Sequence, residues 1–305
     1  MSTIFGFGKR YPKMADLFEL VVNNDGKIFT HSRIMHADDA LCGALLKSMI
    51  YIVNTKFNTT VDLKIQRVND QYLKEHGLND KIVLIFDIGG GKFDHHQGDC
   101  PCRDSSNLSK YAALGRLWAE IGEEICLLDG AMNEEAAKIA AEYLDKTFIQ
   151  NMDRTDNFGQ ENYPNPLSFY VKALTRPDYY IDTDSAYNSF VSHFDFQCLI
   201  ECAIAHGNDL IQAKKLAEST KKDYIVLPEF IPAANFANTH IKFTITESIR
   251  DKGCWNLNAV DSKKWPVPTG CEGETFCHAQ RFLAVFDSEE HAIAAAELGI
   301  QENKD

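Results

Sequence analysis

Residues 81–97 read KIVLIFDIGGGKFDHHQ, and this stretch decides the predicted fold. Residues 82–88 are nearly all apolar, which is typical of a strand buried in a parallel sheet. The glycines at 89–91 allow backbone conformations that other residues avoid, so we expect a sharp turn that brings Asp94, His95 and His96 back toward Asp87. A turn is preferred to a phosphate-cradling loop, because the GxxxxGK[ST] pattern is absent and no helix directly follows.

The segments before this stretch extend the pattern. Residues 27–30 and 61–68 are predicted as strands, and residues 40–53 have the apolar spacing of a helix. A polar segment with some helical character separates the second strand from residues 82–88. This order predicts an α/β fold with a mainly parallel sheet flanked by helices. Ligand sites in such sheets gather at the carboxyl ends of the strands, where His36, Asp38 and Asp87 fall.

Two further helices are predicted over residues 109–122 and 133–152. The second leads directly into Asp153 and Asp156. The helix dipole opposes negative charge at the carboxyl end of a helix, so aspartates there are a weak hint of a site. We therefore add both aspartates to the candidate site.

The remainder of the chain predicts a second, smaller domain. Residues 159–184 are rich in Pro, Asn, Tyr and Asp, which interrupts regular structure. A helix over 186–219, short strands over 224–227, 241–246 and 282–286, and a helix over 289–298 follow. The predicted organisation is a first domain over residues 1–190 and, over 191–305, a linker helix with a smaller α+β domain.

The composition limits the class of protein. The chain has 305 residues, 45% of them hydrophobic, and a net charge of −13. This length and hydrophobic content predict a globular protein. No apolar run approaches the roughly 20 residues of a membrane helix, and the first residues lack the pattern of a signal peptide, so we expect a cytoplasmic protein without a membrane partner. Nine cysteines fit a reducing compartment, and the pairs Cys100/Cys102 and Cys271/Cys277 lack the paired CxxC knuckles of structural zinc. The negative charge disfavours long contacts with duplex nucleic acid but allows a small phosphorylated substrate or a short strand.

Acidic residues and histidines gather in four segments of the chain. Taken singly, each could be a loop histidine, a helix cap or a surface acid. Together, carboxylates and imidazoles suit Mn²⁺ or a similar divalent ion, and there are enough of them for two ions that act on a phosphoryl group. The candidates are His31, His36, Asp38, Asp39, Asp87, Asp94, His95, His96, Asp153 and Asp156.

Four motifs in order carry a resemblance to a known family. The Asp94-His95-His96 triplet resembles the DHH phosphoesterase superfamily. More closely, THSRIMHADDALCGALLK, FDIGGGKFDHHQ, MDRTDNFG and GETFCHAQRFLAVF are similar to the successive signatures of the melanocyte-proliferating-gene (Myg exonuclease) family. The resemblance runs from about residue 28 to residue 295 and implies a metal-dependent hydrolase, in eukaryotes a 3′-to-5′ RNA exonuclease.

The resemblance also implies roles for residues of the first domain. His36 and Asp38 would bind one ion, Asp87 would bridge two ions, and His95 with Asp153 or Asp156 would complete the second site. His96 would either support a metal ligand or polarise the phosphate, and Asp94 would orient the histidines. Many superfamily members have HxDxD in the first motif, whereas Asp38 and Asp39 are adjacent here, which leaves the role of Asp39 open.

The second domain departs from the superfamily in its substrate loop. The glycine-rich GGGH-like loop is missing, and the sequence reads His278-Ala-Gln-Arg281. Arg281 and His278, together with His31, are the candidates for binding the substrate, because arginine offers a planar fork suited to phosphate. A salt bridge or a packed histidine in an ordinary strand explains the first two equally well.

The sequence therefore predicts a Mn²⁺-dependent phosphodiesterase with two ions, acting as a 3′-5′ exonuclease on short single-stranded RNA. Two alternatives stay open. One is a hydrolase of a small phosphoester such as pyrophosphate or a cyclic dinucleotide, and the other is a metal-binding scaffold without catalysis. A homodimer is also left open.

Overall fold

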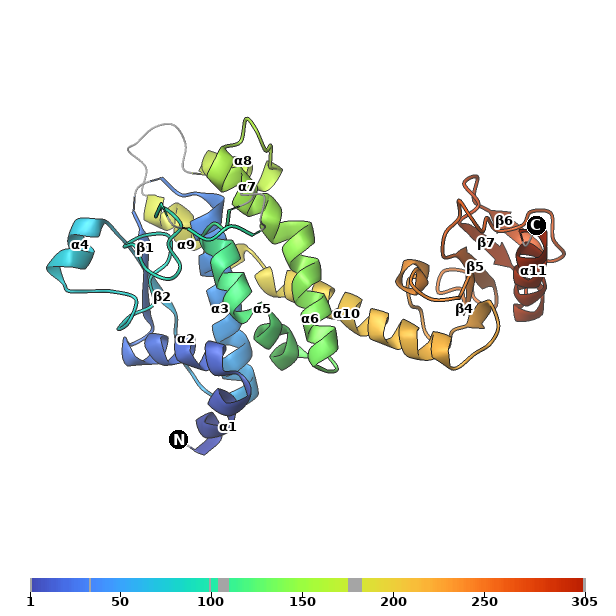
Figure 1. Cartoon of the computed structure of the whole chain (residues 1–305), viewed down its shortest axis with the longest axis horizontal. Coiled ribbons are helices and arrows are strands. Elements are labelled where there is room, and N and C mark those ends of the chain that lie inside the picture. Colours follow the sequence, from blue (N-terminus) through green and yellow to red (C-terminus); the bar gives the residue numbers. More distant parts are fainter. Residues whose placement is uncertain (1, 33, 99, 104–109, 175–182, 304–305) are drawn as a thin grey trace. The chain divides into compact units, whose positions relative to one another are not determined.

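The structure, a computed structural model, describes residues 2–32, 34–98, 100–103, 110–174 and 183–303. The chain divides into two compact units, Met1–Gly207 and Asn208–Asp305. This division falls inside helix α10 (Phe196–Glu218), shown in yellow-orange in Figure 1. The predicted domain boundary, between residues 190 and 191, lies before this division and stays a prediction.

The sheet of the first unit is smaller than predicted. Strands β1 (Lys27–His31) and β2 (Lys64–Val68) pair in parallel, and they are the whole regular sheet in this unit's described residues. Residues 82–88 lie beside β1 but form no regular strand: a single bridge joins Phe29 to Ile85. The parallel pairing predicted for this sheet is confirmed for β1 and β2, whereas the predicted third strand forms only this one bridge, so the sheet is smaller than predicted. The reason is local, because the Asp87 N–H turns back and donates to the Phe93 carbonyl, which ends the pairing with β1.

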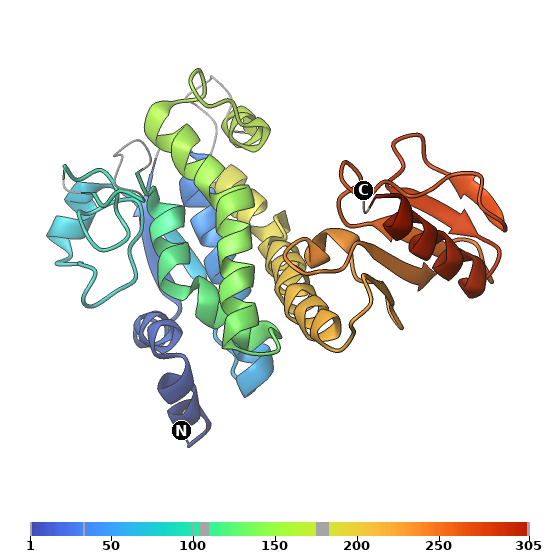
Figure 2. The same ribbon diagram turned by 45° about the vertical axis from the view of Figure 1, so that its right-hand side comes forward.

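Helices make up most of the first unit. The long helix α3 (Ala37–Phe57) is buried almost all round, which is why its sequence is apolar on most faces. It packs against α5 (Ala113–Asp129), and α5 packs against α6 (Glu134–Leu144); the three lie side by side in both views (Figures 1 and 2). Other helices of this unit are α1 (Ser2–Arg10), α2 (Pro12–Asn23), α4 (Asp70–Glu75), α8 (Pro166–Leu174) and α9 (Thr183–His193).

Two of the predicted helices are divided differently. The helix predicted over 133–152 is α6, a π-helical turn η1 (Asp145–Ile149) and α7 (Gln150–Phe158), which ends at Gly159 with φ +82°. Asp153 and Asp156 therefore lie within a helix and not in a turn after it. The helix predicted over 186–219 is interrupted, because the Asp195 side chain accepts a hydrogen bond from the Cys198 N–H and starts α10 as a separate helix. Of the predicted helix over 109–122, residue 109 lies outside the described residues.

The second unit has its own sheet and core. Its strands are β3 (Tyr224–Val226), β4 (Phe243–Glu247), β5 (Trp255–Ala259), β6 (Glu274–Cys277) and β7 (Leu283–Phe286). Their order is β3-β4-β5-β7-β6, with β3 and β4 parallel and the other neighbours antiparallel. Helix α11 (Glu289–Glu302) packs on β4, β5 and β7 (Figure 2). Strands β5 and β6 and the 3₁₀ turn η2 (Ala233–Phe236) were not predicted.

In the described part of the chain, every helix is too short or too polar to span a bilayer.

Candidate metal centre

Four chain segments bring the predicted acidic residues and histidines together. His31 ends β1, His36 precedes α3, and Asp38 lies in the first turn of that helix. Asp87 follows the segment beside β1, His95 belongs to the turn after the glycines, and Asp156 is on α7. The candidate residues of these four segments thus lie close together, and their roles stay a prediction.

Three overlapping groups of side chains have the spacing of a metal site. In each group the candidate ligand atoms lie within 4.8 Å of one another. Asp87 belongs to two groups and His95 to two, so the three groups form one continuous cluster. The groups are His31/His36/Asp87, Asp87/His95/His96 and Asp38/His95/Asp156.

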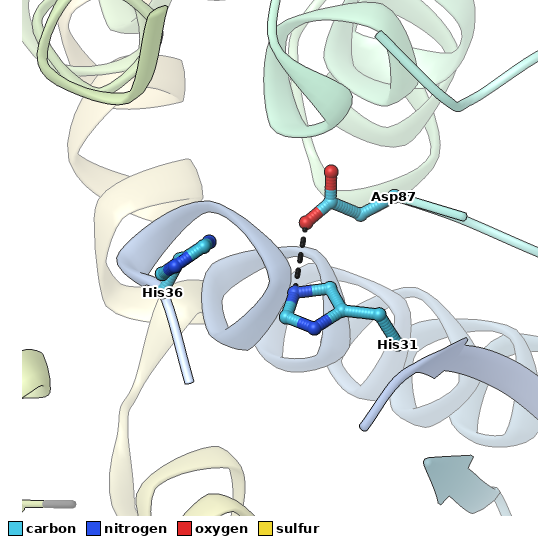
Figure 3. Close-up of side chains that lie close together, drawn as sticks. All are labelled: His31, His36 and Asp87. Atoms are coloured by element: carbon cyan, nitrogen blue, oxygen red, sulfur yellow. Dashed lines mark ion pairs between the residues drawn. The ribbon is translucent and has the colours of Figure 1, made fainter. Parts of the chain in front are cut away.

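Asp87 lies between two histidines. Its Oδ2 is 3.2 Å from Nε2 of His31, and its Oδ1 is 3.1 Å from Nε2 of His95. Figure 3 shows His31 and Asp87 pointing toward one another with His36 beside them. Burial opposes ionisation of Asp87, but the close contacts with the two histidines and their charges hold its pKa below the ordinary value. Asp87 is therefore a carboxylate that needs positive charge on both sides.

The histidines respond to the same contacts. Burial works against a charged ring, yet the contact with Asp87 and the charge of Asp39 raise the pKa of His31 to about 9. For His95, burial is likewise opposed by the close contacts with Asp156 and Asp87, which raise its pKa to about 11. Its Nε2 lies 3.1 Å from both carboxylates. In the metal-free protein, protons on these rings supply the positive charge that the carboxylates require.

Asp38 is fixed by the start of α5. Its two oxygens accept hydrogen bonds from the Ala113 and Leu114 N–H groups, both at 2.9 Å. Backbone N–H groups at a helix N-terminus favour a negative charge there. Burial, followed by the charges of Asp156 and Asp87, nevertheless raises the pKa of Asp38 well above its ordinary value. A cation beside Asp38 would relieve both effects.

The buried donor atoms of the cluster fit a divalent ion. Buried polar atoms in folded proteins nearly always have a well-aligned hydrogen bond. Four atoms of this cluster are buried and have none among the described residues, although charged partners lie within 3.4 Å. These atoms are Nε2 of His31, Oδ2 of Asp39, Oδ1 of Asp87 and Nε2 of His95. Imidazole nitrogens and carboxylate oxygens converging in this way are suitable ligands for Mn²⁺ or a similar divalent ion.

Asp153 and Asp156 have different surroundings, although the sequence left them equivalent. Asp156 faces His95 and belongs to a metal-like group. Asp153 is fully buried, binds Arg103 through Nε at 2.7 Å, and accepts a hydrogen bond from the Gly115 N–H at 3.2 Å. Arg103 had not been identified from the sequence, because a single arginine in a polar loop has no periodic signal. Asp153 is thus the partner of a buried arginine and belongs to none of the three metal-like groups.

Asp94 acts on His96 more than on His95. Its carboxylate accepts hydrogen bonds from the Gly90 N–H at 2.7 Å and from Nδ1 of His96 at 2.8 Å. The His96 side chain is 60% exposed, whereas that of His95 is 8% exposed. His96 is therefore the exposed histidine of this pair, and its Nδ1 is held by Asp94.

Asp39 helps to position α3. Its Oδ1 accepts a hydrogen bond from the His36 N–H at 2.8 Å, and its Oδ2 lies 3.4 Å from Nε2 of His31. Burial raises the pKa of Asp39 to about 7. The buried Tyr187 hydroxyl, which the sequence did not single out, donates to the Asp39 carbonyl at 2.9 Å. Asp39 is outside the three metal-like groups found among the described residues.

The glycine turn has the predicted conformation. Gly89 and Gly90 have φ of +85° and +72°, and Asp87 itself has φ +58°. We expect Gly90→Ala to lower the free energy of unfolding by about 1–2 kcal/mol, because a Cβ has room there but the left-handed backbone disfavours it. Urea unfolding checks this. Gly98→Ala is the matched control, with open space and no positive φ, and an equal loss in both variants would contradict the explanation.

The residues of this cluster lie in a part of the chain that matches a known protein family. The model of the MYG1 exonuclease family, described as an uncharacterised protein family (UPF0160), matches residues 27–197. The chain belongs to this family. All the residues of the three metal-like groups lie within the matched range.

Two curated proteins of the MYG1 family are similar to the chain. The MYG1 protein of Dictyostelium discoideum is 30% identical over 151 residues, which is 47% of this chain and 42% of that protein. A MYG1 protein of Schizosaccharomyces pombe is 28% identical over 191 residues, 59% of this chain and 54% of that protein. The chain thus matches about half the length of these relatives. No solved structure matches it.

Two of the predicted substrate residues lie outside the range matched by the MYG1 family. Arg281 and His278 belong to the β6–β7 connection of the second unit. Nε of Arg281 donates to the Val267 carbonyl at 2.7 Å, and the His278 ring lies 4.2 Å from that of Phe282. These contacts are of the ordinary packing kind, and a role in substrate binding stays a prediction for both residues.

Proposed function

We propose that the protein is a divalent-metal-dependent phosphodiesterase that removes nucleotides from the 3′ end of short single-stranded RNA. The observation that carries this proposal is the continuous cluster of carboxylates and imidazoles with buried, poorly partnered ligand atoms. The exonuclease in the family's name supports the reaction class. The resemblance of the Asp94-His95-His96 triplet to the DHH phosphoesterases supports attack on phosphorus.

The ligand assignment follows the three groups. Asp87 is proposed to bridge two Mn²⁺ ions, because each of its oxygens faces a different histidine. His31 and His36 would complete one site, and Asp38, His95 and Asp156 the other. Two assignments differ from those expected from the sequence. Asp38 is proposed to share an ion with His95 and Asp156 and not with His36, and His31 is proposed as a metal ligand and not as a substrate-binding residue. Asp153 is assigned a supporting role through Arg103.

The chain's own residues contribute to the chemistry in two ways. When bound, such ions supply Lewis acidity at the phosphoryl group and make water a better nucleophile at neutral pH. Asp94 holds Nδ1 of His96, so Nε2 is the ring nitrogen left to contact a phosphoryl oxygen or a leaving group. Release of protons from His31 and His95 would accompany metal binding, because only neutral imidazole is a ligand.

The substrate class rests on charge. A net charge of −13 does not favour long polyanions, whose affinity comes from many Lys and Arg contacts. A short strand needs only local contacts at its reacting end. Short single-stranded RNA is therefore preferred over duplex nucleic acid as the substrate.

A hydrolysis panel tests the proposal. It contains 5′-labelled RNA and DNA oligonucleotides of several lengths, cyclic dinucleotides and pyrophosphate, each with Mn²⁺. We expect the wild type to shorten RNA stepwise from the 3′ end, and the double variant His95→Ala/His96→Ala to lose at least about hundredfold in rate, since it lacks one ligand and one candidate acid–base group.

The control carries two equivalent changes elsewhere. His76→Ala/His193→Ala removes two exposed histidines outside the metal-like groups and should keep the wild-type rate. Cleavage of pyrophosphate or a cyclic dinucleotide without cleavage of RNA would replace the nuclease by a small-phosphoester hydrolase. Binding of Mn²⁺ without cleavage of any substrate would favour the scaffold.

A further inference from the structure

Arg116 lies at the edge of the metal cluster without being one of its ligands. It follows directly on three α5 residues whose N–H groups hold site carboxylates: Ala113 and Leu114 bind Asp38, and Gly115 binds Asp153. The base of the Arg116 side chain is therefore within one helical turn of the site. Its Nη1 donates to the Asp94 carbonyl, which belongs to the peptide bond preceding His95.

The guanidinium of Arg116 makes no ion pair within the residues that the structure describes. Two carboxylates near this part of α5 have other partners: Asp153, which accepts from the Gly115 N–H, pairs with Arg103, and Glu120, one turn further along the helix, pairs with Lys92 at 2.8 Å. The hydrogen bond to the Asp94 carbonyl uses one N–H of Arg116, and the residue is only partly buried. A guanidinium has five N–H donors, so most of them remain available.

Asp94 contacts two side chains that carry N–H donors. Its carboxylate fixes His96, whose ring is exposed, and its carbonyl fixes Arg116. The cluster itself is rich in carboxylates, which repel a phosphate that approaches without a cation. An arginine fork matches two oxygens of a phosphoryl group, and such charge-assisted hydrogen bonds are about twice as strong as neutral ones.

We propose that Arg116 is an anion-binding residue of this site, which receives a phosphoryl oxygen of the substrate through the N–H groups that Asp94 does not use. The identity of the substrate rests on the proposed function, but the binding of a phosphoryl group does not require turnover. The ligand class is a phosphate mono- or diester, recognised by its oxygens.

Calorimetric titration of inorganic phosphate into the full-length protein, saturated with Mn²⁺, tests this. We expect Arg116→Gln to weaken phosphate binding at least about tenfold, the loss of one hydrogen bond to a charged group. Arg116→Lys should lie between this variant and the wild type, because it keeps the charge but not the fork. Lys138→Gln removes an exposed cation from α6 and should bind phosphate like the wild type.

A parallel titration with Mn²⁺ separates binding from support. Unchanged Mn²⁺ affinity together with weaker phosphate binding supports the assignment, even if no member of the hydrolysis panel is cleaved. Equal phosphate affinity in wild type and Arg116→Gln overturns it, as does an absence of phosphate binding by the wild type. A parallel fall in Mn²⁺ affinity also overturns it, because Arg116 would then act by holding the turn that carries His95. Circular dichroism confirms folding, and if Arg116→Gln is unfolded the same criteria apply to Arg116→Lys.

Discussion

Asp87→Asn is expected to remove divalent-metal binding while the chain stays folded. Asp87 is shared by two of the three metal-like groups and has a buried oxygen without an aligned hydrogen bond. Loss of a residue that merely supports a ligand costs roughly ten- to hundredfold in affinity. Loss of a bridging carboxylate should therefore weaken Mn²⁺ binding by more than about hundredfold and remove hydrolysis, as measured by titration calorimetry and by the panel above.

The asparagine is chosen to leave the backbone undisturbed. Asp87 has φ +58°, and asparagine is among the few residues other than glycine that tolerate this region. Its side chain has the same size and keeps one oxygen that can accept a hydrogen bond from His31 or His95. A loss of metal binding then reports the missing charge and not a change of fold.

Asp25→Asn is the matched control. Asp25 also has a left-handed backbone, with φ +53°, but its side chain is exposed in the turn before β1. It should bind Mn²⁺ as the wild type does. If Asp87→Asn binds Mn²⁺ with unchanged affinity, the cluster is not the metal centre and the proposed function falls with it.

The location of the cluster could be predicted from local sequence. A buried apolar run followed by glycines identified the turn that carries Asp94, His95 and His96, because φ above zero is needed there and glycine supplies it. The start of α3 was visible in its apolar spacing. Both features depend on residues that are close together in the sequence, and the sequence alone was therefore enough to predict them.

The partners within the cluster depended on geometry that a sequence does not carry. Asp153 and Asp156 are three residues apart, and the phase of α7 after the π-helical turn η1 decides which of them faces His95. Arg103 lies 50 residues before Asp153 in a loop without periodicity. The prediction of a third strand over residues 82–88 was wrong because an apolar run indicates burial, whereas a regular strand also requires the hydrogen bonds of a sheet.

The buried ion pairs of Arg103 should make the largest contribution to stability near the site. Arg103 donates to Asp153 at 2.7 Å and to both oxygens of Asp145 at 2.7 and 2.8 Å, and its side chain is 7% exposed. Removing one partner of a buried pair typically costs about 3–5 kcal/mol, because a charge is left without compensation. We expect Arg103→Met to lose this amount at pH 8.5 in urea unfolding, and Lys146→Met, which breaks an exposed pair, to lose no more than about 0.5 kcal/mol.

The loss should depend on pH in a defined direction. Burial raises the pKa of Asp153 to about 7, although Arg103 pulls it down. A carboxyl group whose pKa is higher in the folded state takes up a proton on folding, so its contribution to stability falls as the pH rises from its unfolded value through its folded value. In the wild type, the contribution of Asp153 to stability stops falling near pH 7. Without Arg103 the folded-state pKa of Asp153 is higher, so this contribution keeps falling above pH 7. Arg103→Met should therefore differ from the wild type more at pH 8.5 than at pH 5.5, and an equal difference at both would show that Asp153 does not depend on the charge of Arg103.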